Sequence, residues 1–247
     1  AEDGVDGTFG AVTTGSAFLD TQLVYGEDKV ALKVSIAADA FEAVAGSANR
    51  AAAAAALDSL KQSGTSLALY NSIAFLGSEG EARRAFEQLA GDSYASVKTG
   101  LIESAHLTTD AITGRLRDDV AVEGKEGPAV WATGFGSWID HDRNSNTGTL
   151  KTSTGGFLVG VDVDVASGLR LGVAGGYSKT DLKMKARAAS ADSDNWHLGV
   201  YAGKTWGALG LNAGLTYTWH SIDLSRSVAF AGFSDALSSD YKARTLQ

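Results

Sequence analysis

Four short stretches of the chain carry residue types that could perform chemistry. His106 and Asp110 lie four residues apart, so a helix would place an imidazole and a carboxylate on one face, where they could contact a metal ion. No third ligand lies nearby, and a solvated helix face is the better interpretation. Asp162 and Asp164 flank one valine, so a strand would put both carboxylates on one face, like an acid–base pair. We interpret them instead as a polar pair facing a lumen.

The other two stretches are weaker. The sequence Gly134-Phe135-Gly136-Ser137-Trp138 lacks the final glycine of a nucleophile elbow, and Ser137 on a strand is better interpreted as wall lining. His141-Asp142-Arg143 lies in a polar connection and is typical of a solvated turn. GxGxxG, P-loop and HExxH motifs are absent from the sequence, as is cysteine. We therefore expect no catalytic, cofactor-binding or metal-ligating residue in this chain, no cofactor, and no enzyme activity of its own.

Composition narrows the class of partner. The 247 residues include 30 glycines and one proline and carry a net charge of -8. An acidic chain without a basic cluster argues against nucleic acid. No stretch approaches the roughly 18 apolar residues of a transmembrane helix, so any membrane insertion would use β-structure. The first residues lack the features of a signal peptide, and we expect an exported protein to be represented here by a mature fragment.

From Ala129 onward the pattern is that of β-strands with alternating short and long connections. The predicted strands are Ala129–Ile139, Gly156–Val165, Leu169–Thr180, Asn195–Thr205, Ala208–Asp223 and the start of a sixth at Tyr241–Gln247. Long polar loops are expected at 140–154, 181–194 and 224–240. This arrangement is typical of transmembrane β-barrels, with brief turns on one side of the membrane and long loops on the other.

Alternation within the strands assigns two faces. Phe157, Val159 and Val161 share one face of the second strand, while the other face carries glycine and aspartate. A soluble sandwich would bury the apolar face against a second sheet, whereas a barrel would point it at lipid. The tryptophans favour the barrel, because all five are expected near strand ends, at two interfacial levels: Trp131, Trp138, Trp196, Trp206 and Trp219.

The first half is organised differently. Short strands are predicted at 8–12, 18–25 and 29–36, followed by helices at about 51–64, 66–77 and 82–89. A longer helix is expected from Asp92 or Ser93 to about Arg117, with apolar residues three and four apart. Its last turns are small or polar. A helix of this kind could lie in a wet lumen, or it could be an ordinary amphipathic helix on a globular domain.

The order of these segments resembles the C-terminal part of type V autotransporters. The resemblance rests on the phrase Leu89-Ala90-Gly91-Asp92-Ser93-Tyr94-Ala95-Ser96, on a helix ending Arg115-Leu116-Arg117-Asp118, and on a first strand beginning Val130-Trp131-Ala132. It implies four parts: the β-solenoid-like end of a passenger (1–46), a helical region (47–91), a pore helix and linker (92–128), and the first strands of a barrel (129–247). The implied fold is mainly β with an α-helical segment, a partial transmembrane antiparallel barrel.

The resemblance also implies a function and a location. The barrel would be an outer-membrane translocator that exports its N-terminal passenger to the cell surface. Its partners would be outer-membrane lipid, the barrel-assembly machinery and its own passenger. We expect the lumen to be lined by glycines and polar residues, with two arginines of the helix facing them: Gly134, Gly136, Gly160, Asp162, Asp164, Arg170, Gly172, Gly176, Gly199, Gly203, Gly210, Asn212, Gly214, His220, Arg115 and Arg117.

Two departures from the family leave alternatives open. Five strands and part of a sixth leave an open sheet edge, which cannot stand in lipid, so we expect the rest of the barrel in a longer protein. Thr109-Asp110 stands where self-cleaving members carry an Asn-Asn pair, which makes that cleavage doubtful. The alternatives are an enzyme or adhesin whose active part lies upstream, and a small porin-like barrel. The apolar stretch 228–233 is expected to cover the barrel mouth or to touch the passenger.

Overall fold

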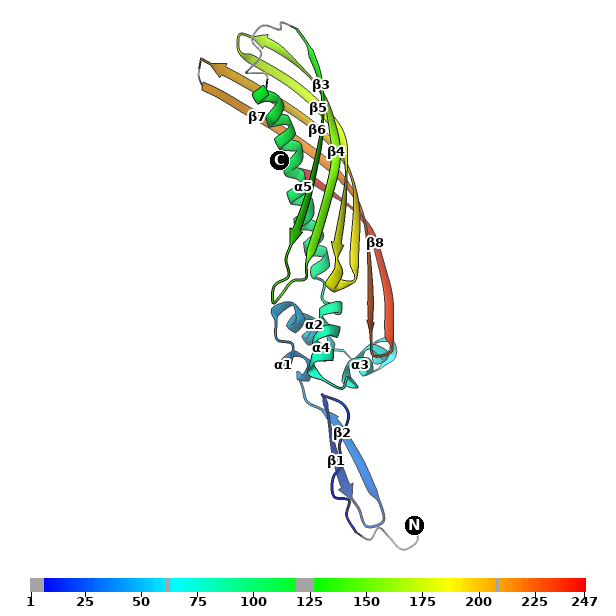
Figure 1. Cartoon of the computed structure of the whole chain (residues 1–247). Coiled ribbons are helices and arrows are strands. Elements are labelled where there is room, and N and C mark those ends of the chain that lie inside the picture. Colours follow the sequence, from blue (N-terminus) through cyan, green and yellow to red (C-terminus); the bar gives the residue numbers. More distant parts are fainter. Residues whose placement is uncertain (1–6, 61–62, 119–126, 208) are drawn as a thin grey trace.

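The computed structural model describes residues 7–60, 63–118, 127–207 and 209–247. One antiparallel sheet contains six strands in chain order: β3 (Ala129–His141), β4 (Leu150–Ala166), β5 (Leu169–Met184), β6 (Ala189–Trp206), β7 (Leu209–Phe230) and β8 (Phe233–Leu246). The 27-residue helix α5 (Asp92–Asp118) runs along one face of this sheet (Figure 1). The mainly β fold with a long helix is therefore confirmed. The sheet is open, with β3 and β8 at its edges.

The strand connections differ at the two ends of the sheet. At one end the turns are tight, and Gly168 and Gly207 adopt positive φ angles of 68° and 59° that favour glycine. At the other end the predicted long loops at 181–194 and 224–240 are wrong. Strands β5 and β6 continue to the 3₁₀ turn η3 (Lys185–Arg187), and β7 and β8 meet at Ala231–Gly232.

The error has a physical cause. In these segments polar residues on the outer face alternate with apolar residues on the inner face. The apolar residues are buried in one cluster with α5: Leu182, Met184, Ala189, Ala191, Ile222 and Leu224. The polarity of the outer residues resembles that of a loop when it is taken alone. Burial of the alternate positions keeps the chain extended. Of the three predicted loops, the one between β3 and β4 keeps the longest segment without strand structure, at 142–149.

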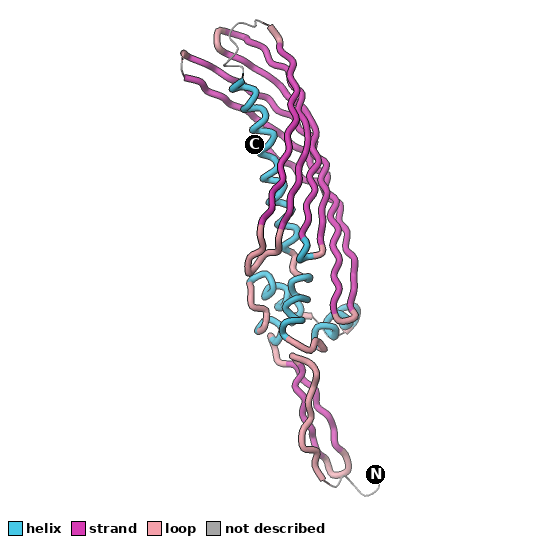
Figure 2. Tube along the Cα trace, viewed as in Figure 1, coloured by secondary structure: helices cyan, strands magenta, loops and turns pink. Residues whose placement is uncertain are grey.

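The N-terminal end is a hairpin of β1 (Leu19–Tyr25) and β2 (Val30–Ile36), which lies beyond the helices from the sheet (Figure 2). The strand predicted at 8–12 does not form. There the backbone N–H of Phe9 donates to the Tyr25 hydroxyl at 2.7 Å, a side-chain partner rather than a neighbouring strand. Where a solenoid-like end was expected, the described residues give one antiparallel hairpin.

Residues 40–91 form a small helical region with its own core. Its helices are α1 (Ala40–Ala43), α2 (Ala48–Asp58), α3 (Leu67–Ala74), preceded by the 3₁₀ turn η1 (Gly64–Ser66), and α4 (Glu79–Leu89). Phe41, Ile73 and Phe86 are fully buried at the centre. Ser78 caps α4, since its Oγ accepts a hydrogen bond from the N–H of Glu81. The three predicted helices are confirmed with shifted ends, and α1 was not predicted because it is only four residues long.

Within the described ranges, none of the helices combines the length and the apolar character needed to cross a membrane.

Candidate functional site

The first half of α5 packs on the sheet through apolar side chains. Val97 and Leu101 are buried in one cluster with Leu182 and Met184 of β5 and with Ile222 of β7. Gly100 allows this approach. A Cβ atom at that position would clash with the Leu182 side chain and lie 3.0 Å from the Thr152 hydroxyl. The helix therefore lies against the wall at the minimum distance that its backbone permits.

The middle of α5 contacts the sheet through polar side chains. The Ser104 and Thr154 hydroxyl oxygens are 2.7 Å apart, and Glu103 lies 2.9 Å from the His141 ring. Further along, the Thr108 hydroxyl faces His197 of β6 at 3.4 Å. These contacts change the character of the interface from apolar to hydrogen-bonded over about one turn of the helix.

The second half of α5 is held by a buried charge pair. Asp162 of β4 is 1% exposed, and its two carboxylate oxygens accept hydrogen bonds from Arg115 at 3.0 and 3.1 Å. The Tyr201 hydroxyl donates to the same carboxylate at 2.9 Å and accepts from the Trp131 indole at 2.6 Å. A bidentate pair with further hydrogen bonds is the arrangement in which a buried carboxylate is stable.

Between two apolar clusters, the wall beneath the helix carries a network of polar side chains. The side chains that form this network, all of them buried, lie on four strands: Thr154, Ser178, Thr180, Ser193, Asn195, His197, Thr218 and His220. They bond one another at 2.7 to 3.2 Å. A soluble sheet would bury apolar residues here. This sheet buries hydrogen-bonded groups and leaves its apolar residues outside.

The opposite, convex face is apolar and exposed. Residues there are 40 to 62% exposed, and they form a band across β4 to β7: Phe157, Val159, Val161, Leu171, Val173, Leu198, Val200, Leu211 and Leu215. Trp196 and Trp219 are directly opposite each other on β6 and β7 at one border of the band, and Trp206 stands at the other. An exposed band with aromatic borders is the outer surface of a membrane barrel.

Several of the glycines predicted to line the lumen lie under α5 or under an inner side chain. A Cβ at Gly199 would lie 3.0 Å from Ile112, and one at Gly203 the same distance from Leu116. Gly160 and Gly172 make room for the rings of Trp131 and Tyr201, and Gly176 for Leu158. Asn212 and Gly214 line a pocket of 360 Å³ beside α5, whereas Gly210 is exposed at the short-turn end.

Strand β3 is reversed relative to the sequence-based assignment. Gly134 and Gly136 share the convex face with Trp138, which is 80% exposed, while Trp131 is buried on the concave face. A shift of one residue exchanges the two faces of a strand, and the glycines were taken as inner because glycines are inner on the other strands. Trp131 is therefore a hydrogen-bond donor on the concave face, and four tryptophans remain at the borders of the exposed band.

Three other polar residues predicted to face the helix tail have partners on the sheet. Asp164 and Arg170 pair with each other at 2.8 Å beside the turn between β4 and β5, although Arg170 also approaches Asp162 at 3.6 Å. His220 bonds Asn195 and Thr245 several residues from the level of Arg115. Arg117 is exposed. Of the two arginines expected to face the wall, Arg115 binds a carboxylate of the sheet.

The residues whose types and spacing could perform chemistry have structural surroundings that account for them. His106 and Asp110 are exposed on α5. Across the described residues, no three His, Cys, Asp or Glu side chains are grouped so as to hold a metal ion. Asp162 is neutralised by Arg115 rather than available as an acid or base. Sequence reasoning missed Tyr201, His197 and Ser104, although all three follow from strand or helix periodicity once the correct face is known.

Comparison with known proteins identifies the sheet. The family described as the autotransporter beta-domain matches residues 130–247. These residues are an autotransporter β-domain. Two curated relatives, both named extracellular serine protease and both from Serratia marcescens, are 38% and 35% identical over 187 residues. Each alignment covers 72% of this chain and 18% of the relative. No solved structure matches the chain significantly.

The β-domain assignment confirms the family expected from the order of segments. It confirms the function of this part at the level of the family, an outer-membrane translocator of type V secretion that exports a linked passenger. An alignment over 72% of the chain also extends well beyond the β-domain match, so part of the helical half shares in the similarity. The chain spans 18% of the length of the curated relatives it matches.

Proposed function

We propose that α5 is the pore helix of this translocator, lying inside a barrel of which the six strands form the wall. The observation that carries the proposal is the difference in burial between the two faces of the sheet. The concave face buries Asp162 against Arg115 of α5, while the convex face exposes an apolar band bordered by tryptophans. The convex band then contacts outer-membrane lipid between the level of Trp206 and that of the Trp196–Trp219 pair.

The proposal assigns a direction to the molecule. The tight turns and the C-terminal end of α5 face the periplasm, and the long hairpins and the helical region face the cell surface, as in barrels with short periplasmic turns. Residues 1–46 are then the end of the passenger, 47–91 the helical region, 92–128 the pore helix and linker, and 129–247 the first part of the barrel. Assembly requires the barrel-assembly machinery.

In this proposal residues 1–46 are only the end of the passenger, and its active part belongs to the longer protein. Both relatives carry the name extracellular serine protease, which supports a protease as the passenger of this protein too. The activity then belongs to the passenger and not to the described site, where the buried carboxylate is paired with arginine. Deleting the upstream region should abolish secreted proteolysis and leave assembly of the β-domain intact.

Four measurements test the translocator proposal. The full-length protein should be found in outer-membrane fractions and migrate differently before and after boiling, and protease added to intact cells should cut residues 7–36. A porin-like barrel is the competing function, and it predicts a high single-channel conductance. With α5 in the lumen we expect low conductance that rises on its deletion. Recovery of the protein from the soluble fraction without detergent would contradict the proposal.

A further inference from the structure

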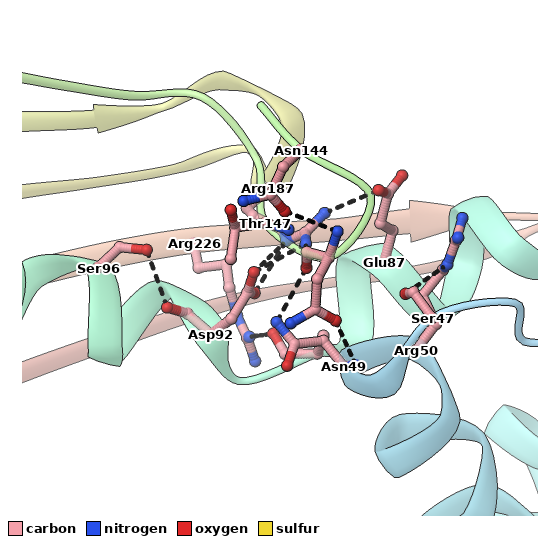
Figure 3. Close-up of polar contacts among 12 residues, drawn as sticks. Ser47, Asn49, Arg50, Glu87, Asp92, Ser96, Asn144, Thr147, Arg187 and Arg226 are labelled. Carbon is pink, nitrogen blue, oxygen red and sulfur yellow. Dashed lines mark hydrogen bonds and ion pairs between the residues drawn. The ribbon is translucent and has the colours of Figure 1, made fainter. Parts of the chain in front are cut away.

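A cluster of polar contacts joins the outer ends of the strands to the helical region (Figure 3). Its centre is Arg187, at the end of η3, whose side chain is 3% exposed. The Arg187 guanidinium lies 2.8 Å from a carboxylate oxygen of Asp92 and 3.2 Å from one of Glu87. One buried cation therefore connects the hairpin of β5 and β6 to the end of α4 and to the first residue of α5.

Two other strand connections contact the same region. Asn146, between β3 and β4, accepts a hydrogen bond from the backbone N–H of Asn49 at 2.8 Å through its side chain and one from the Asn49 amide at 2.9 Å through its carbonyl. On β7, Arg226 donates to the carbonyl of Ala90 at 2.9 Å. All three outer connections of the strands thus contribute to one contact area.

The tip of the β7–β8 hairpin completes this area. The N–H of Ala229 donates to the Gln88 side chain at 2.7 Å, and Phe230 packs against the core of the helical region. The apolar stretch 228–233 therefore reaches the helical region, while Phe233 stacks on Phe230 at 5.4 Å. Polar contacts at the centre of this area and an apolar contact at its edge together fix the orientation of the helical region relative to the strands.

The burial of Arg187 distinguishes this cluster from ordinary surface ion pairs, which contribute little. Burial alone lowers the pKa of Arg187, but the hydrogen bonds and charges of Asp92 and Glu87 outweigh it and hold the pKa above its usual value. Removing Arg187 leaves the carboxylates of Glu87 and Asp92 facing each other without this cation, and removing both carboxylates leaves the buried guanidinium without its charge partners. Either change should separate the parts of the contact together.

We infer that these contacts form a latch, with Arg187 as its central residue, that holds residues 40–91 over the outer end of the lumen. The name latch refers to Arg187, Glu87, Asp92, Asn49, Asn146 and Arg226. Because Asp92 is the first residue of α5, the latch also fixes the axial position of the pore helix. This inference rests on the proposed function for the direction of the lumen, but the docking itself does not depend on it.

Cross-linking within the full-length protein in outer membranes tests the latch. This chain has no cysteine, and Ala52 and Thr147 line one cavity between α2 and the loop of β3 and β4 without taking part in the latch. Cysteines at these two positions should be joined rapidly by a short bismaleimide. We expect Arg187→Gln to slow this cross-linking at least tenfold and to raise single-channel conductance severalfold.

A matched control keeps the test specific. Arg50→Gln removes a guanidinium that donates to Ser47 inside the helical region, and it should leave cross-linking unchanged. Parental cross-linking in Arg187→Gln overturns the latch, and slowed cross-linking with parental conductance overturns closure of the lumen. If Arg187→Gln does not assemble, the double variant Glu87→Gln with Asp92→Asn removes the same ion pairs without changing a residue of the sheet, and it should slow cross-linking in the same way. Surface arrival of the passenger, measured on the same cells, reports separately on the translocator proposal.

Discussion

On strand β4, Leu158 and Asp162 of the concave face are each 1% exposed, whereas Phe157, Val159 and Val161 of the convex face are 40 to 51% exposed. The two faces of the same strand thus reverse the usual preference, with a charge inside and large apolar groups outside. The concave face is ordered by hydrogen bonds that need specific partners, whereas the apolar side chains of the convex face are largely exposed. Most substitutions on the concave face should therefore lower stability, whereas the convex face should tolerate the exchange of one apolar residue for another.

The largest effect is expected inside. Asp162→Ala removes the buried carboxylate that accepts hydrogen bonds from Arg115 and Tyr201, and we expect a cost of about 4 kcal/mol in the free energy of unfolding. Urea unfolding of the protein in detergent micelles measures it. Asp164→Ala is the control, since its side chain is 38% exposed and should cost about 0.5 kcal/mol. Equal losses for both variants would mean that the helix is not held by the buried pair.

A charge on the convex face tests the other half of the comparison. Leu198→Arg places a guanidinium in the middle of the exposed apolar band and should destabilise the protein in lipid vesicles by about 3 kcal/mol. Ser221→Arg, two residues beyond Trp219 on the same face, should cost less than about 1 kcal/mol. A similar small effect at both positions would show that the band does not contact lipid.

Substitutions at the two glycines of α5 distinguish the effect of packing against the sheet from the effect of helix propensity. Gly100→Val forces a branched side chain into Leu182 and Thr152, and we expect a loss of about 2 kcal/mol. Among the described residues, no atom beyond the neighbouring helix backbone lies within 4 Å of a Cβ placed at Gly114, so Gly114→Ala should gain about 0.8 kcal/mol from helix propensity alone. Unfolding in micelles measures both. A gain for an alanine or valine at position 100 would place α5 further from the sheet than the structure has it.

Much of this architecture could be predicted from local patterns. The extent of α5 follows from apolar residues spaced three and four apart, and the faces of β4 to β7 follow from strict alternation in each strand. Those patterns are properties of single elements, and so they survive without knowledge of the neighbours. The position of Asp162 on the concave face follows from the same alternation, but its partner Arg115 does not.

The errors concern relations between elements. The glycines of β3 were assigned to the wrong face because the faces of this strand depend on its register with β4. That register pairs Ala129 with Asp162, which is 33 residues further along the chain. The polar hairpin ends were taken for loops because the residues that bury their inner face belong to α5. The contacts of Arg187 with Glu87 and Asp92 join segments about 100 residues apart, and no local signal marks Arg187 among the other basic residues of the chain.

The smallest expected effect lies on the convex face outside the apolar band. Asp181, Asp192, Asp223 and Asp240 are directly opposite one another on four successive strands, beyond the level of Trp196 and Trp219. The side-chain hydrogen bond from Asp181, together with burial and the Asp181 charge, raises the pKa of Asp192 above its ordinary value of 3.8. Like charges directly opposite each other destabilise a sheet, so Asp192→Asn should stabilise the hairpin by about 0.5 kcal/mol.

The sign of the pH dependence follows from the raised pKa. Asp192 is protonated more readily in the folded hairpin than in the unfolded chain, so its contribution favours folding below the ordinary pKa and is lost as the pH rises through the raised one. The gain from Asp192→Asn should therefore be complete at neutral pH and vanish toward pH 3.8 and below. Thermal unfolding across this range checks it, with Asp235→Asn as the control, because Asp235 faces Val228 rather than a carboxylate. A gain that is constant with pH would assign the effect to packing instead of to the aspartate row.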